Sequence, residues 1–88
     1  MTKNLDNEVY AVWPLPMKEK LNLWVNPKSN KPVITIYTMT GEKVMDKALL
    51  VDHEGMSSVK VKNLAPGTYR IRVTGTGKKP FEQVVQKR

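Results

Sequence analysis

The sequence contains no cysteine, a single histidine and no long hydrophobic run. Without cysteine the chain has no disulfide framework and no thiolate chemistry. A single histidine excludes a metal site built on paired imidazoles. No apolar stretch approaches the roughly 20 residues needed to span a bilayer, and the first residues lack the apolar core of a signal peptide. We therefore expect no transmembrane segment, and an export signal would have to lie upstream of these residues.

Helical spacing of apolar residues is also scarce. The nearest candidate is 43–51, KVMDKALLV, which has the propensity for a short helix. We predict a strand there instead, because strands are predicted on both sides of it. Elsewhere apolar and polar residues alternate with a period of two, which is typical of strands with one buried face. The predicted strands are 8–13, 20–25, 32–38, 43–51, 57–62, 68–74 and 81–86.

About seven short strands in 88 residues predict one all-β domain, an immunoglobulin-like β-sandwich. Residues 1–7 are predicted to be a linker, and residues 8–88 are predicted to form the domain. The alternation also predicts which side chains form the core between the two sheets. These are Leu21, Leu23, Ile36, Val59, Val61, Tyr69, Ile71 and Val73.

The stretch from Leu64 to Tyr69, LAPGTY, has the pattern of a tyrosine corner. Pro66 and Gly67 are expected to turn the chain between the two sheets. The hydroxyl of Tyr69 is expected to bond a backbone group a few residues upstream. Gly67 is expected to adopt a backbone angle that a Cβ would penalise. A corner of this kind is a folding device that occurs in many sandwiches, so it does not assign a function.

The net charge of +7 is distributed unevenly. Residues 1–56 contain equal numbers of basic and acidic side chains, whereas residues 57–88 contain eight basic side chains and Glu82 alone. Such a basic field favours nucleic acid, an anionic glycolipid or an acidic protein surface as a partner. It is equally compatible with solubility and with protection of edge strands by lysine. Charge alone leaves both interpretations open.

Candidates for chemistry are few. Asp52-His53-Glu54 has metal-ligand side chains, but consecutive residues of an extended chain point to opposite sides, so a polar loop is favoured. Gly75-Thr76-Gly77-Lys78 lacks the spacing of a phosphate-binding loop and is interpreted as a hairpin turn. The serines have no predictable base. We predict no catalytic residue, no metal and no cofactor, and a chain that is not an enzyme.

Five aromatic residues could stack on bases or sugars, but most of them lie in strand patterns where burial is the usual outcome. They are Tyr10, Trp13, Trp24, Tyr37 and Phe81. A single-strand binder would interleave aromatic and basic residues on one sheet face. The basic strands at 57–62 and 68–74 have no outward aromatic residue, so a nucleic-acid partner is not expected.

Four short motifs occur in a characteristic order. They are Trp13-Pro14-Leu15-Pro16 with the strand up to Leu23, then VITIYTMTGEKV with Gly41 and Val44, then Leu64, Gly67, Tyr69, Ile71 and Val73, and finally PFEQVVQKR. In this order the set resembles the type A C-terminal sorting domain of the type IX secretion system of Bacteroidota, over about residues 9–88. Pro14, Pro16, Gly41, Leu64, Gly67 and Tyr69 match its structural motifs. Leu15 replaces its usual asparagine, and Gln83 stands where a lysine is often found.

The resemblance implies a non-catalytic secretion signal at the C-terminus of an exported cargo. The implied partners are the type IX translocon, its shuttle proteins, a surface sortase and the fused cargo. The implied location is the periplasm in transit, then the cell surface or the medium. Resemblance and charge together suggest that the translocon contacts Lys60, Lys62, Arg70, Arg72, Lys87 and Arg88. The alternative is an immunoglobulin-like or fibronectin-like binding module of a surface protein that contacts glycan or protein.

Overall fold

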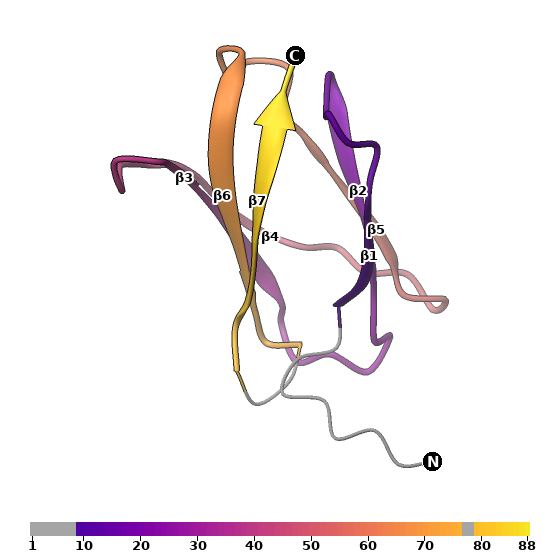
Figure 1. Cartoon of the computed structure of the whole chain (residues 1–88). Helices are drawn as coiled ribbons and strands as arrows, with labels where there is room; N and C mark the ends of the chain where they lie inside the picture. Colours follow the sequence, from indigo (N-terminus) through magenta and orange to yellow (C-terminus); the bar gives the residue numbers. More distant parts are fainter. Residues whose placement is uncertain (1–8, 77–78) are drawn as a thin grey trace, which may run out of the picture.

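The computed structural model describes residues 9–76 and 79–88, which form seven strands packed as a two-sheet sandwich (Figure 1). One sheet has three strands in the order β1-β2-β5, and the other has four in the order β4-β3-β6-β7. All neighbouring strands are antiparallel. The strands are β1 (Val9–Trp13), β2 (Lys20–Val25), β3 (Val33–Thr38), β4 (Lys43–Ala48), β5 (Met56–Lys60), β6 (Gly67–Thr74) and β7 (Phe81–Lys87). The all-β fold predicted from the sequence is confirmed, and the described residues contain no helix.

The core between the two sheets is formed by side chains at alternate positions of the strands. In β2 and β6 buried apolar residues alternate with more exposed ones, as expected for strands that cover one face of a sheet. All eight predicted core residues are buried. The core also includes Met17, Val25, Ile34, Leu49 and Val85, which the sequence analysis did not single out.

The segment 43–51 forms a strand, as predicted, but the strand ends at Ala48. Its pairing with β3 is irregular between Ile36 and Tyr37, so the alternation is broken there. Leu49 then leaves the strand, donates its N–H to the carbonyl of Pro32 at 2.9 Å and is buried. The helical propensity of this segment is therefore overridden by its pairing with β3.

The chain between β1 and β2 joins the two sheets. It contains cis peptide bonds before Pro14 and Pro16 and then places Met17 beside β7. The N–H of Met17 donates to the carbonyl of Gln86 at 2.8 Å, and the N–H of Arg88 donates to the carbonyl of Met17 at 2.9 Å. The Met17 side chain is fully buried. This short parallel bridge closes one side of the core and covers the last part of the β7 edge.

The strand registers define two opposite ends of the sandwich. At one end Lys20 lies opposite Lys60, and Lys87 lies beside both Gly67 and Met17. At the other end β1 begins, and the turns that follow β2 and β6 meet through a hydrogen bond from the N–H of Asn30 to the carbonyl of Gly75. Figure 1 shows the start of β1 and the end of β7 at these opposite ends. The predicted linker, 1–7, lies outside the described residues.

Candidate interaction surfaces

The tyrosine corner is present. The hydroxyl of Tyr69 donates to the carbonyl of Ala65 at 2.6 Å, and its ring is buried. Leu64 packs against the core, and its N–H donates to the carbonyl of Val61 at 3.0 Å. Gly67 has a φ of 156° at the start of β6, near the edge of the range that favours glycine. The corner residues therefore have a structural role.

Gly41 also has a structural role. Its φ is 97°, and its N–H donates to the carbonyl of Thr38 at 2.9 Å in the turn before β4. Pro14 and Pro16 belong to the segment that leads to Met17. Leu15 projects outward between them and lines, with Pro16, Val84, Val85 and Gln86, a shallow hollow of about 350 Å³ beside β7.

The six basic residues predicted to contact the translocon do not form one surface. Lys60, Lys62, Lys87 and Arg88 lie at the end of the sandwich where β5 and β7 finish. Lys18 and Lys20 lie at the same end, because β2 begins there, and the sequence analysis missed them. We call this end the basic end, and its members are Lys18, Lys20, Lys60, Lys62, Lys87 and Arg88.

The basic end carries a hollow and a buried lysine. The hollow, about 150 Å³, is lined by Glu19, Lys20, Lys60 and Lys62. Lys87 was predicted to follow the last strand, but it is the last residue of β7 and is buried on the core side. Its Nζ donates to the carbonyl of Arg88 at 2.8 Å. Lys87 is therefore poorly placed for direct contact with a partner, whereas the other members of the basic end are exposed.

Arg70 and Arg72 lie elsewhere, on the outer face of the four-stranded sheet. Arg72 forms an ion pair with Glu82 of β7, with 3.4 Å between Nη1 and Oε2. Arg70 lies between Tyr37 of β3 and Val84 of β7 in the sheet register. Arg70 and Arg72 therefore lie apart from Lys60, Lys62, Lys87 and Arg88, and their contact with the translocon stays a prediction.

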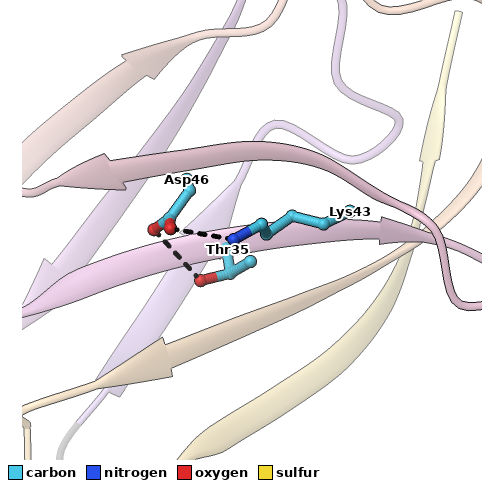
Figure 2. Close-up of polar contacts among 3 residues, drawn as sticks. All are labelled: Thr35, Lys43 and Asp46. Atoms are coloured by element: carbon cyan, nitrogen blue, oxygen red, sulfur yellow. Dashed lines mark hydrogen bonds and ion pairs between the residues drawn. The ribbon is translucent and has the colours of Figure 1, made fainter.

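The same outer face contains a small polar cluster around Asp46 of β4 (Figure 2). The carboxylate accepts a hydrogen bond from the Thr35 hydroxyl at 3.5 Å and forms an ion pair with Lys43 at 3.3 Å. Both charged side chains are more than half exposed. Exposed pairs of this kind contribute little stability, about 0.2–1 kcal/mol. The cluster gives the edge strand β4 a polar, water-exposed surface.

The aromatic residues divide into two groups. Phe81 packs against the core and Tyr37 is half-buried, which agrees with the expected burial. Tyr10, Trp13 and Trp24 are exposed, so the expected burial is wrong for them. Trp24 shares its side of β2 with Lys20 and Asn22, opposite the core residues of that strand. The sequence therefore contained a signal for this exposure, because Trp24 occupies the same alternate positions of β2 as Lys20 and Asn22.

The loop before β5 is a polar turn. One carboxylate oxygen of Asp52 accepts hydrogen bonds from the N–H groups of Glu54 and Met56, each at 2.9 Å. These backbone donors lower the pKa of Asp52, and the nearby His53 adds to the effect. Within residues 9–76 and 79–88, no three side chains of the types that bind metals come together. Gly77 and Lys78 of the predicted hairpin turn lie outside the described residues.

None of the described residues belongs to a helix long and apolar enough to cross a membrane. Comparison with curated proteins and with solved structures gives no match. The family described as the secretion system C-terminal sorting domain matches residues 11–87, nearly the whole chain. The match spans all four motifs, from the segment around Pro14 and Pro16 to the last strand. The chain therefore belongs to this family, whose members are C-terminal sorting signals of type IX secretion.

Proposed function

We propose that this domain carries a cargo fused upstream of β1 out of the periplasm through the type IX translocon. In this proposal shuttle proteins and the translocon handle the folded sandwich. A surface sortase then acts on it, and the cargo reaches the cell surface or the medium. The domain itself catalyses no reaction. The observation that carries the proposal is the family match over 11–87, because it covers both sheets rather than one motif.

The positions of the two ends of the sandwich support this proposal. An upstream cargo joins at the end where β1 begins, and the basic end lies opposite. The basic end therefore extends away from the cargo and meets a receptor first. A concentrated positive field raises the rate of encounter with an acidic surface. Arg70 and Arg72 lie on a different face and have a smaller part in this proposal.

The test is an export assay. A fluorescent reporter with an ordinary Sec signal is fused in front of the 88 residues and expressed in a host that has the type IX machinery. Fluorescence at the surface and in the medium is compared with the periplasmic pool. The proposal predicts that most of the reporter leaves the periplasm, and a fusion that stays there would refute it.

Two charge variants then test the basic end. Each changes four exposed basic residues to glutamine, so both lose the same charge. The basic-end variant is Lys18→Gln, Lys60→Gln, Lys62→Gln and Arg88→Gln, and the control is Lys28→Gln, Lys31→Gln, Lys43→Gln and Arg70→Gln. We expect export of the first to fall about tenfold or more, the lower range of steering effects, and export of the control to change little. Equal losses would show that net charge matters and position does not.

A further inference from the structure

The outer face of the three-stranded sheet presents aromatic side chains in neighbouring rows. Trp24 lies between Ala11 and Met56 in the register. The next row contains Trp13, Asn22 and Ser58, and the row after it contains Lys20 and Lys60. The rings of Tyr10 and Trp24 meet edge to face, with centroids 5.1 Å apart and 70° between their planes. We call the set Tyr10, Trp13, Trp24 and Met56 the aromatic face.

These four side chains expose large apolar surfaces. The exposed fractions are 46% for Tyr10, 40% for Trp13, 43% for Trp24 and 38% for Met56. They are four of the nine large hydrophobic residues that the described part of the chain exposes. No described strand lies on the outer side of this sheet (Figure 1). A contiguous exposed apolar patch on a small domain typically marks an interaction site.

We propose that the aromatic face is the docking surface for a protein of the secretion machinery, with an apolar centre and an acidic margin on the partner. The inference rests on the proposed function and adds to it the face that makes the close contact. The basic end steers the encounter, whereas the aromatic face provides the buried centre of the complex.

The composition of the aromatic face favours a protein partner. Tryptophan, tyrosine and methionine are enriched at the centres of protein interfaces, where tryptophan and tyrosine dominate the binding energy. Asn22 and Ser58 beside them supply polar groups for the margin. Tyr10 stands at a steep angle to Trp24, so the two rings do not form the flat platform on which a sugar ring stacks. The shape therefore fits side chains of a protein better than a glycan.

The positive charge beside the aromatic face indicates that the margin of the partner's surface is acidic. Lys20 and Lys60 lie directly opposite each other on β2 and β5, an arrangement that costs stability. Neither forms an ion pair with another described residue. The two lysines and Lys47 line a hollow of about 300 Å³, together with Ala48, Leu50, Ser58 and Val59. Leu50 is 88% exposed beside this hollow, and none of its lining residues is acidic. A carboxylate next to an apolar side chain complements this surface.

The experiment uses the same reporter fusions and leaves every lysine and arginine unchanged. The face variant is Trp13→Ser, Trp24→Ser and Met56→Ser. The matched control, Leu15→Ser, Met39→Ser and Val84→Ser, removes three exposed apolar side chains elsewhere. We expect surface and medium fluorescence of the face variant to fall about tenfold or more, which matches the loss of one or two interface hot spots. The control is expected to export like the wild type.

A second pair of variants does not depend on the tryptophans, since Trp24 also packs beside Gly55 and contributes to the turn there. Leu50→Glu introduces into the hollow the negative charge that the partner is proposed to supply. Val44→Glu adds the same charge at another exposed apolar position. Leu50→Glu is expected to reduce export several-fold, and Val44→Glu to leave it unchanged. Circular dichroism of each purified variant checks that it is folded, and if the face variant is not, the Leu50→Glu pair decides.

Other results separate the alternatives. If the wild type exports and both the face variant and Leu50→Glu export equally well, the proposal is wrong and the sorting function stands. If the wild type stays in the periplasm, the proposed function and this inference fail together. A dimer in sedimentation equilibrium that the face variant abolishes, with unchanged export, would assign the face to a second copy. Binding of polygalacturonate in isothermal titration calorimetry, lost in the face variant with unchanged export, would assign it to a glycan. Either assignment overturns the proposal.

Discussion

The tyrosine corner gives the sharpest test of the fold, because one atom and one ring can be removed separately. Tyr69→Phe removes only the hydroxyl that donates to the carbonyl of Ala65. Ala65 is exposed, so water can satisfy its carbonyl in the variant. The loss should therefore be the ordinary net value of one hydrogen bond, about 1 kcal/mol.

Tyr69→Ala also removes a buried ring from β6, which lies between β3 and β7. Loss of a buried aromatic side chain costs about 3–5 kcal/mol. An 88-residue domain has a total stability of roughly 4–13 kcal/mol by the usual value per residue. The alanine variant should therefore lose a large share of the domain's stability, whereas the phenylalanine variant should lose only a small share.

Urea unfolding followed by far-ultraviolet circular dichroism measures both effects. Tyr69→Phe should lower the urea midpoint by about 0.3–1 M, given the usual dependence on urea of about 1–3 kcal/mol per molar. Tyr37→Phe is the control, because that tyrosine is half-buried and its hydroxyl has no hydrogen-bond partner among the described residues. Equal midpoints for the wild type and both Tyr69 variants would refute the reasoning, since neither the bond nor the ring would then contribute stability.

Two further predictions concern the loop before β5. A Cβ at Gly55, where φ is 92°, would overlap the carbonyl oxygen of Val25, so Gly55→Ala should cost about 2–4 kcal/mol. Gly41→Ala, with a similar φ but open space around it, should cost about 1–2 kcal/mol, and equal thermal shifts would contradict the role of the overlap. The folded-state pKa of Asp52 lies below its unfolded value, so its contribution is present above the unfolded pKa, near 4, and lost as pH falls through the folded one. The gap in unfolding free energy between the wild type and Asp52→Ala should therefore shrink from pH 6 to the acid range, and a constant gap would show that the carboxylate charge is irrelevant.

The sequence predicted the strands well because each strand's pattern is local. In β2 the alternation of Leu21, Leu23 and Val25 with Lys20 and Asn22 is sufficient to assign a strand and its buried side. The corner was predictable for the same reason, since Leu64, Gly67 and Tyr69 lie within six residues. The end of β4 was less predictable, because Leu49 is apolar like a strand residue, yet it is buried after the strand ends.

The candidate surfaces were predicted less well, because they depend on which strands are neighbours. Lys18 and Lys20 are distant in sequence from Lys60 and Lys62, and only the β2–β5 register brings them to one end. Arg70 and Arg72 are close in sequence to Lys62 but belong to the other sheet. The burial of Lys87 was also ambiguous, since Val84 and Val85 are both apolar and do not indicate which side of β7 faces the core.

The edge strands of the two sheets show why an exposed aromatic face need not lead to indiscriminate association. Edge strands invite pairing with other chains unless they are blunted. Here β1 carries a bulge between Val9 and Ala11, and Met17 covers the last part of β7. The edge strand β4 is irregular in its pairing with β3 and exposes Lys43 and Lys47. Such edges discourage indiscriminate strand pairing, whereas the aromatic face presents side chains and no free backbone groups. Association through that face therefore requires a complementary surface, which is the selectivity that a sorting signal needs.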